Sequence, residues 1–175
     1  MSQPKIAVDL ILKNLTESTQ KAKTRVRKAS EVLLGPLETD LAKTPYDVVY
    51  EEDRVTLKHY VPEKVTHKLP LLVVYALINR ETMLDLQPGR SVVQTFLDQG
   101  IEVYMIDWGY PTRKDRYTTI DDHVNGYMDN IVDFIRDQHG LPQINLMGIC
   151  MGGAFSVMYS ALHPEKIKNL VTTVT

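Results

Sequence analysis

Apolar runs separated by amphipathic stretches dominate the sequence from Tyr46 onward. The run from Leu69 to Ala76 is almost wholly apolar, which is typical of a strand buried on both faces of a sheet. The runs 48–50 and 55–60 flank the polar turn 51–54, and we expect these two strands to pair antiparallel. Together the runs predict β-strands over residues 48–50, 55–60, 69–76, 101–107, 144–147 and 170–174.

Three helices are predicted between these strands, over residues 91–97, 119–139 and 152–162. Ser91 can cap the first helix, and Thr119 with Asp122 makes a capping-box-like start for the second. Gly140 stops the second helix. Strands and helices that alternate in this order predict a mostly parallel sheet with helices on both faces, which places the chain in the α/β class.

Residues 1–45 form a separate segment with a different pattern. Small and apolar residues recur there at helical spacing, and Gly35-Pro36 ends the pattern. Two interpretations are open: an amphipathic helix docked on its own domain, or a surface for a partner subunit, an anionic ligand or a lipid-like phase. The N-terminal part of an α/β domain is expected over residues 46–175. A basic cluster lies within the N-terminal segment, at Lys21, Lys23, Arg25, Arg27 and Lys28.

Composition narrows the classes of function. The chain has 175 residues, a net charge of −2, 43% apolar and 24% charged residues, which is ordinary globular composition. The near-neutral balance gives no argument for nucleic-acid binding. No apolar run approaches the roughly 18 residues of a membrane span, and a cytoplasmic location is expected. A single cysteine excludes an intrachain disulfide and a cysteine-based zinc cluster, and no metal or cofactor is expected.

That cysteine lies in the motif Gly148-Ile149-Cys150-Met151-Gly152-Gly153. The motif matches the nucleophile elbow G-x-S-x-G, with cysteine in place of serine, between a predicted buried strand and a helix. The elbow glycines Gly148, Gly152 and Gly153 leave room for a turn that presents the sulfur at a helix N-terminus, where negative charge is stabilised. The Met151 N–H would point at the oxygen of an attacked carbonyl. The alternative is an inert cysteine in a tight turn.

Two further loops are expected at the same edge of the sheet. In folds with a nucleophile elbow, the loop after the third strand supplies the second backbone oxyanion donor. Here that loop follows residue 76, and Leu77 and Ile78 are the candidates. Trp108 and Tyr110, in the loop after residue 107, either line a substrate channel or wedge against the core. The basic stretch Arg113, Lys114 and Arg116 either contacts phosphates or forms a solvated loop.

A nucleophilic cysteine needs a base, and no histidine is well placed for that role. In this fold the acid and the histidine follow the nucleophile, on loops after later strands. Only 25 residues follow Cys150, and Glu165 is the only acid among them. We therefore expect an N-terminal part of a larger enzyme, truncated before the acid and histidine and inactive alone. The histidines are His59, His67, His123, His139 and His163.

Four separated segments resemble the catalytic subunit of polyhydroxyalkanoate synthases, most closely the two-component class III and then class IV types. The segments are Pro70 to Arg80, Tyr104 to Pro111, Asp121-Asp122 with Asn125-Gly126-Tyr127, and Gly148 to Gly153. The resemblance covers residues 45–175 well and the N-terminal segment loosely.

The resemblance implies an α/β-hydrolase fold and an acyltransferase that polymerises (R)-3-hydroxyacyl-CoA, typically 3-hydroxybutyryl-CoA, and releases CoA. It makes Cys150 the nucleophile that holds the growing polyester chain as a thioester, and the Met151 and Ile78 N–H groups the oxyanion donors. Leu77, Trp108 and Tyr110 are candidates for the substrate channel. The resemblance also implies a second, non-catalytic subunit, with a homo-oligomer as a further option, and the surface of cytoplasmic polyester granules as location.

Two other functions remain open at this point. One is a hydrolase or thioesterase with a cysteine nucleophile on the same fold, because the elbow alone does not separate transfer from hydrolysis. The other is a catalytically incomplete piece that acts only in assembly, which the basic N-terminal segment and the missing acid and histidine favour.

Overall fold

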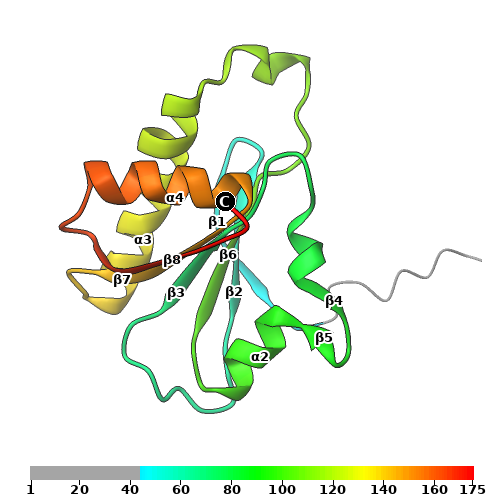
Figure 1. Ribbon diagram of the computed structural model, residues 1–175, viewed down its shortest axis with the longest axis vertical. Coiled ribbons are helices and arrows are strands. Elements are labelled where there is room, and N and C mark those ends of the chain that lie inside the picture. Colours follow the sequence, from blue (N-terminus) through cyan, green and yellow to red (C-terminus); the bar gives the residue numbers. More distant parts are fainter. Residues whose placement is uncertain (1–43) are drawn as a thin grey trace, which may run out of the picture. The chain divides into compact units, whose positions relative to one another are not determined.

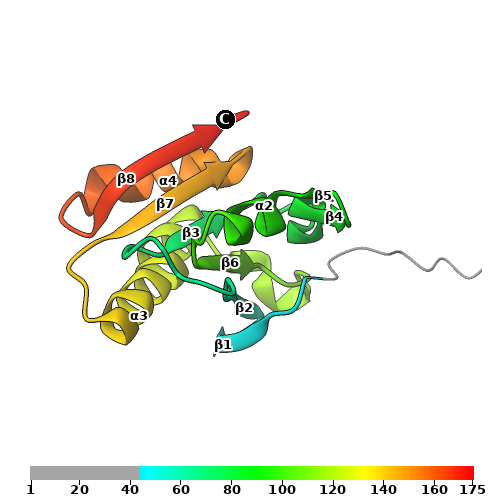
Figure 2. The same ribbon diagram turned by 90° about the horizontal axis from the view of Figure 1, so that it is seen from below.

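A six-stranded mixed sheet forms the centre of the fold, as Figure 1 shows. The computed structural model describes residues 44–175, so the helix predicted within residues 1–45 lies outside the described residues. The strands across the sheet follow the order β1-β2-β6-β3-β7-β8, which Figure 2 displays from bottom to top. They are β1 (Asp47–Glu52), β2 (Val55–Tyr60), β3 (Leu71–Val74), β6 (Val103–Asp107), β7 (Ile144–Ile149) and β8 (Ile167–Thr173).

The four strands β6, β3, β7 and β8 run parallel, and β2 joins them antiparallel through β6. β1 and β2 form the predicted antiparallel pair. Parallel neighbours require crossover connections, and here the crossovers are helices, so the α/β prediction is confirmed. The strand predicted over 69–76 is shorter than its apolar run, because the residues after Val74 enter a loop at the edge of the sheet.

Helices cover both faces of the sheet. The helices are α2 (Val92–Asp98), α3 (Asp129–His139) and α4 (Met151–Leu162), with shorter helical turns η1 (Glu81–Leu84), η2 (Arg113–Tyr117) and η3 (Asp122–Met128). A small hairpin of β4 (Asp85–Gln87) and β5 (Arg90–Ser91) leads into α2. Ser91 caps α2 as predicted, since its Oγ accepts a hydrogen bond from the Gln94 N–H at 2.9 Å.

The helix predicted over 119–139 is not uniform. Thr119 and Asp122 cap it reciprocally, at 2.7 and 3.2 Å, but residues Asp122–Met128 form a π-helix before the α-helix begins at Asp129. This segment buries His123 and Tyr127, and Tyr127 Oη donates to Asp53 Oδ2 at 2.8 Å. Hydrophobic spacing alone does not distinguish a π-turn from an α-turn, which explains the difference.

Two apolar cores lie on opposite faces of the sheet. β3 contributes to both, with Leu72 and Val74 in one core and Leu71 and Val73 in the other. The larger core packs α3 and α4 against the strands, while Val93 of α2 belongs to the smaller one. Burial of each such aliphatic side chain contributes on the order of 2 kcal/mol. The alternation confirms that the 69–76 run contains a strand buried on both faces.

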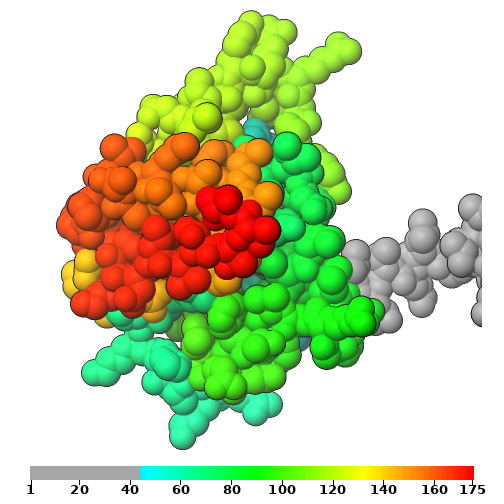
Figure 3. All heavy atoms as spheres, viewed as in Figure 1, coloured from blue at the N-terminus to red at the C-terminus, as the bar shows by residue number. Residues whose placement is uncertain are grey.

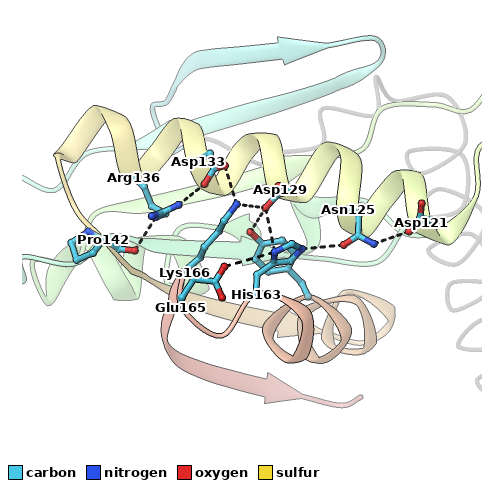
Figure 4. A network of polar contacts seen from close by, with 10 residues as sticks. Asp121, Asn125, Asp129, Asp133, Arg136, Pro142, His163, Glu165 and Lys166 are labelled. Atoms are coloured by element: carbon cyan, nitrogen blue, oxygen red, sulfur yellow. Dashed lines mark hydrogen bonds and ion pairs between the residues drawn. The ribbon is translucent and has the colours of Figure 1, made fainter.

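A polar network joins α3 to the connection between α4 and β8, as Figure 4 shows. Lys166 Nζ donates to Asp129 Oδ1 at 2.6 Å and to Asp133 Oδ2 at 2.9 Å, and Tyr159 Oη donates to Asp129 Oδ1 at 2.7 Å. Burial alone would raise the pKa of Asp129, but the hydrogen bonds from Lys166 and Tyr159 outweigh it and lower the pKa. The network therefore anchors α4, whose first turn follows Cys150.

β8 lies at the edge of the sheet and is largely exposed, visible in red in Figure 3. Only Ile167 of this strand is buried, while Leu170 and Val171 are exposed. Apolar side chains are therefore exposed at this edge of the sheet.

Candidate active site

Cys150 occupies a sharp turn between β7 and α4. Its backbone has φ 57° and ψ −127°, a conformation that a residue with a side chain adopts only under strain. Neighbouring backbone holds it in place: the Cys150 N–H donates to the Thr173 carbonyl at 3.0 Å, and the Gly153 N–H donates to the Cys150 carbonyl at 2.9 Å. The side chain is exposed. The turn has the geometry of a nucleophile elbow, as the sequence predicts.

The glycines around Cys150 are required by close packing. A β-carbon on Gly148 would lie 2.5 Å from the Gly153 Cα and 2.6 Å from the Gly152 carbonyl oxygen. A β-carbon on Gly152 would overlap the Val74 carbonyl, and one on Gly153 would overlap the Thr175 side chain. Backbone cannot give way as a flexible side chain can, so the first two positions admit only glycine without rearrangement.

The loop after β3 lies beside this turn. β3 and β7 pair in parallel, with Val74 opposite Gly148. Ala76 lies two residues after Val74 and Cys150 two residues after Gly148, so the loop and the turn leave the sheet at the same level. Leu77 packs against the core, whereas the Ile78 side chain is 89% exposed. Ile78 also lines the cavity beside this loop, but it is largely open to solvent.

A cavity of about 440 Å³ opens next to this loop and is lined by both predicted loops. Trp108 packs against the core, since it is only 4% exposed and contacts Phe155, and it also lines the cavity. Its role in a substrate channel stays a prediction. Its indole N–H donates to the Tyr75 carbonyl at 3.0 Å. Tyr110 is 73% exposed, with the Arg80 guanidinium 4.3 Å from its ring centre.

A buried charged cluster supports these loops, and the sequence analysis missed it. Lys58 Nζ in β2 lies 2.6 Å from Glu81 Oε1, at the start of η1, and 3.1 Å from Asp107 Oδ2, at the end of β6. Arg80 adds a contact to Asp107 at 3.4 Å. The sequence did contain a signal for this cluster. A lysine interrupts the alternating pattern of the strand at 55–60, and acidic residues lie at or after the ends of β3 and β6.

The charges in this cluster stabilise one another. Burial would lower the pKa of Lys58, but its hydrogen bond to Glu81 and the nearby carboxylates raise it. Burial would raise the pKa of Asp107, but the Gly109 N–H and Lys58 hold it low. Both groups are therefore charged at neutral pH, and Lys58 links the loop after β3 to the loop after β6.

The five histidines all lie within residues 44–175, and no hydrogen bond or ion pair there connects one to Cys150. His59 and His139 contact Glu102, at 2.6 and 3.7 Å. His163 Nε2 lies 3.1 Å from Asn125 Oδ1. His67 is exposed in the loop before β3, at the end of that strand opposite to the loop beside Cys150.

His123 is the one histidine that lines the cavity. Its Nδ1 lies 2.7 Å from the Thr119 carbonyl oxygen, which makes Nδ1 the donor and leaves Nε2 to face Arg54 Nη2 at 3.3 Å. It is buried between Trp108 and Phe155. No sequence pattern indicated that His123 would lie at this cavity.

Residues 44–175 contain no grouping of three or more His, Cys, Asp or Glu side chains suited to a metal ion. Across the same residues, no helix combines the length and apolar character needed to traverse a membrane.

A strand-turn-helix elbow at the carboxyl edge of a mostly parallel sheet defines the class as the α/β-hydrolase fold. The family model for that fold matches residues 70–175. Solved structures agree on the fold: a probable hydrolytic enzyme from Pseudomonas aeruginosa has a TM-score of 0.55 at 15% identity over 77% of this chain and 42% of its own. A sugar hydrolase from Lactococcus lactis has a TM-score of 0.56 at 12% identity, covering 74% and 53%.

The particular family follows from the sequence comparisons. The model described as the N-terminus of poly-beta-hydroxybutyrate polymerase (PhaC) matches residues 7–96. The chain belongs to this polymerase family, which confirms the resemblance seen in the sequence.

Curated relatives carry the name poly(3-hydroxyalkanoate) polymerase subunit PhaC. The Haloferax mediterranei protein is 52% identical over 89% of this chain and 30% of its own length. The Allochromatium vinosum protein is 45% identical over 96% of this chain and 48% of its own. The chain thus spans less than half the length of these two relatives.

Proposed function

We propose that this chain carries the nucleophile of an enzyme that polymerises (R)-3-hydroxyacyl-CoA, with 3-hydroxybutyryl-CoA as the expected monomer. The observation that carries the proposal is the strained position of Cys150 at the N-terminus of α4, in a chain of the PhaC family. Cys150 is exposed and therefore accessible to a substrate.

In the proposed first step, the Cys150 thiolate attacks the thioester carbonyl of the substrate. The N–H groups of Met151 and Ile78 stabilise the oxyanion that forms. The bond between the carbonyl carbon and the CoA sulfur then breaks, CoA leaves as a thiol after taking a proton, and the acyl group remains on Cys150. A thioester-to-thioester exchange suits sulfur, which is both a strong nucleophile and a good leaving group.

In the proposed second step, the hydroxyl of another 3-hydroxyacyl group attacks the acyl thioester and extends the polyester. The apolar wall formed by Leu77 and Trp108 favours a hydroxyl over water at this point. The base for Cys150 and the acid that activates the hydroxyl are assigned to residues after Thr175. The chemistry uses CoA thioester as substrate and no further cofactor.

The family also supports proposals about assembly and location. We assign the chain to a synthase that works with a second, non-catalytic subunit, of the class III or class IV type, and that can self-associate. We place it in the cytoplasm at the surface of polyester granules. A pull-down of the tagged protein from polymer-accumulating cells, with and without the granule fraction, tests both assignments.

Product analysis tests the reaction. The protein encoded by the complete gene, and the 175-residue chain, are each incubated with (R)-3-hydroxybutyryl-CoA, with a partner subunit supplied. Polymer and free CoA from the longer protein support the proposal, and Cys150→Ala should remove both. Free 3-hydroxybutyrate in place of polymer would identify a thioesterase, and no CoA release from either protein would overturn the proposal. Activity of the short chain alone would place the base among its own histidines.

A further inference from the structure

Three cations project from the turn η2, which Figure 1 shows standing away from the sheet in yellow-green. Arg113, Lys114 and Arg116 are all exposed, and none forms an ion pair with any other residue of 44–175. Cations that lack carboxylate partners at a protein surface attract anionic groups.

Contacts of Asp115 hold the turn η2, which carries these cations, in place. Asp115 Oδ1 lies 2.6 Å from Arg54 Nη1, and its Oδ2 accepts the Thr112 hydroxyl hydrogen bond at 2.8 Å. The acids that follow are engaged at the start of η3: Asp122 accepts from Thr119, and Asp121 accepts from Asn125. The acids nearest the three cations in sequence therefore already have partners of their own.

Two exposed aromatic rings accompany the cations. Tyr117 is 76% exposed, and the Arg116 guanidinium lies 4.6 Å from its ring centre. Tyr110 carries the Arg80 guanidinium in a similar way. Flat aromatic and guanidinium surfaces of this kind stack on purine bases.

The base of the turn borders the cavity described above. The Leu77 and Ile78 loop lines that cavity together with Pro111, Asp115 and Thr118. A single hollow therefore connects the loop beside Cys150 to the cationic turn. Most of the surface inside it is apolar, although Arg54, Arg80 and Asp107 also line it. Such a lining suits an uncharged, flexible arm with a few polar groups, while the phosphates of a longer ligand would meet the cations outside.

We propose that Arg113, Lys114 and Arg116 bind the phosphates of the CoA thioester, with the adenine stacked on Tyr117 or Tyr110 and the pantetheine arm along the cavity toward Cys150. The inference rests on the proposed function for the identity of the substrate. The inference goes beyond the proposed function because it assigns a binding site to the end of the substrate that does not react.

Equilibrium binding tests the assignment without turnover. In the protein encoded by the complete gene, with Cys150→Ala to prevent mixed disulfides, the affinities for CoA, 3′-dephospho-CoA and pantetheine are compared. The test variant is R113E/K114E/R116E. The control is K64E/K68E/R90E, an equal charge change at exposed positions, two of which lie in the loop that precedes β3 at the other edge of the sheet.

The test variant should weaken CoA binding at least tenfold, weaken dephospho-CoA binding less, and leave pantetheine binding within twofold. The control should leave all three within twofold. Unchanged CoA affinity in the test variant, or an equal loss for pantetheine, would overturn the assignment. So would loss of binding to anionic lipid vesicles or to an acidic partner protein with CoA affinity intact.

The same experiment separates the two proposals. If the parent protein binds no CoA, the proposed function and this assignment both fail. If CoA binds to the parent protein while the charge reversal has no effect, only this assignment fails, and the product analysis with Cys150 intact still tests the proposed function.

Discussion

Lys58 Nζ lies 2.6 Å from Glu81 Oε1, and both side chains are buried. The pair connects β2 to the first residue of η1, directly after the loop that carries Ile78. Asp107 completes the cluster from the end of β6. A buried ion pair of this kind is costly to break, because removing one partner leaves the other charge uncompensated. Its position indicates that it holds the loop after β3 in place relative to Cys150.

Lys58→Met should therefore slow acyl transfer to Cys150 more than it lowers the reactivity of the Cys150 thiol. We expect the rate at which 4-nitrophenyl acetate acylates Cys150 to fall about tenfold or more, since a displaced oxyanion donor is costly in rate. Alkylation of Cys150 by iodoacetamide needs no oxyanion donor and should stay within twofold.

Three variants control for this result. Lys58→Arg keeps the charge and should restore most of the acylation rate, and Lys64→Met alters an exposed lysine and should have no effect. If Lys58→Met unfolds the protein, the double change K58M/E81L avoids a lone buried carboxylate at Glu81. Equal losses of acylation and alkylation would show a general structural effect and contradict a role in positioning the loop.

Gly152→Ala should destabilise the protein by about 1–3 kcal/mol, the usual cost of overpacking, because its β-carbon would overlap the Val74 backbone. Gly126→Ala is the matched control, since a β-carbon there meets nothing within 4 Å and the position is helical. Alanine at Gly126 should be neutral or stabilising by up to about 1 kcal/mol. Urea unfolding measures both, and equal effects would contradict the packing argument.

The Asp129 network predicts a pH-dependent loss of stability. Because the folded pKa of Asp129 is lowered from 3.8, its contribution is present above that pH and is lost as the pH falls through the lowered pKa. Asp129→Asn should cost about 1–2 kcal/mol at pH 7. That cost should shrink once the pH drops below 3.8.

Unfolding measured from pH 7 to pH 2 tests the dependence. Asp137→Asn, at an exposed position of α3, serves as the control and should change stability little at any pH. A cost at Asp129 that does not vary with pH would mean that shape, and not charge, stabilises the contact with Lys166.

Much of the fold was predictable from the sequence because the relevant signals are local. The continuous apolar run at 69–76, the cap at Ser91 and the glycines around Cys150 each report on their own neighbourhood. The π-helical turn at Asp122–Met128 was not predictable, since so short a segment contains too few apolar positions to reveal its own period.

The missed parts of the candidate site depend on distant pairs. Lys58 and Glu81 are 23 positions apart, and Arg54 meets His123 across 69. Strand order decides such contacts: β2 and β3 are consecutive in the chain, yet β6 lies between them. Without that order, a lysine in β2 and an acid after β3 could not be matched.

The central claim is that Cys150 carries the acyl group. The most direct test is mass spectrometry of the protein encoded by the complete gene, after rapid mixing with (R)-3-hydroxybutyryl-CoA and acid quenching. We predict a hydroxybutyryl thioester, or its oligomers, on the peptide that contains Cys150, formed with CoA release and absent from Cys150→Ala. CoA release at an undiminished rate from Cys150→Ala, or an acyl group found only on another residue, would contradict the account.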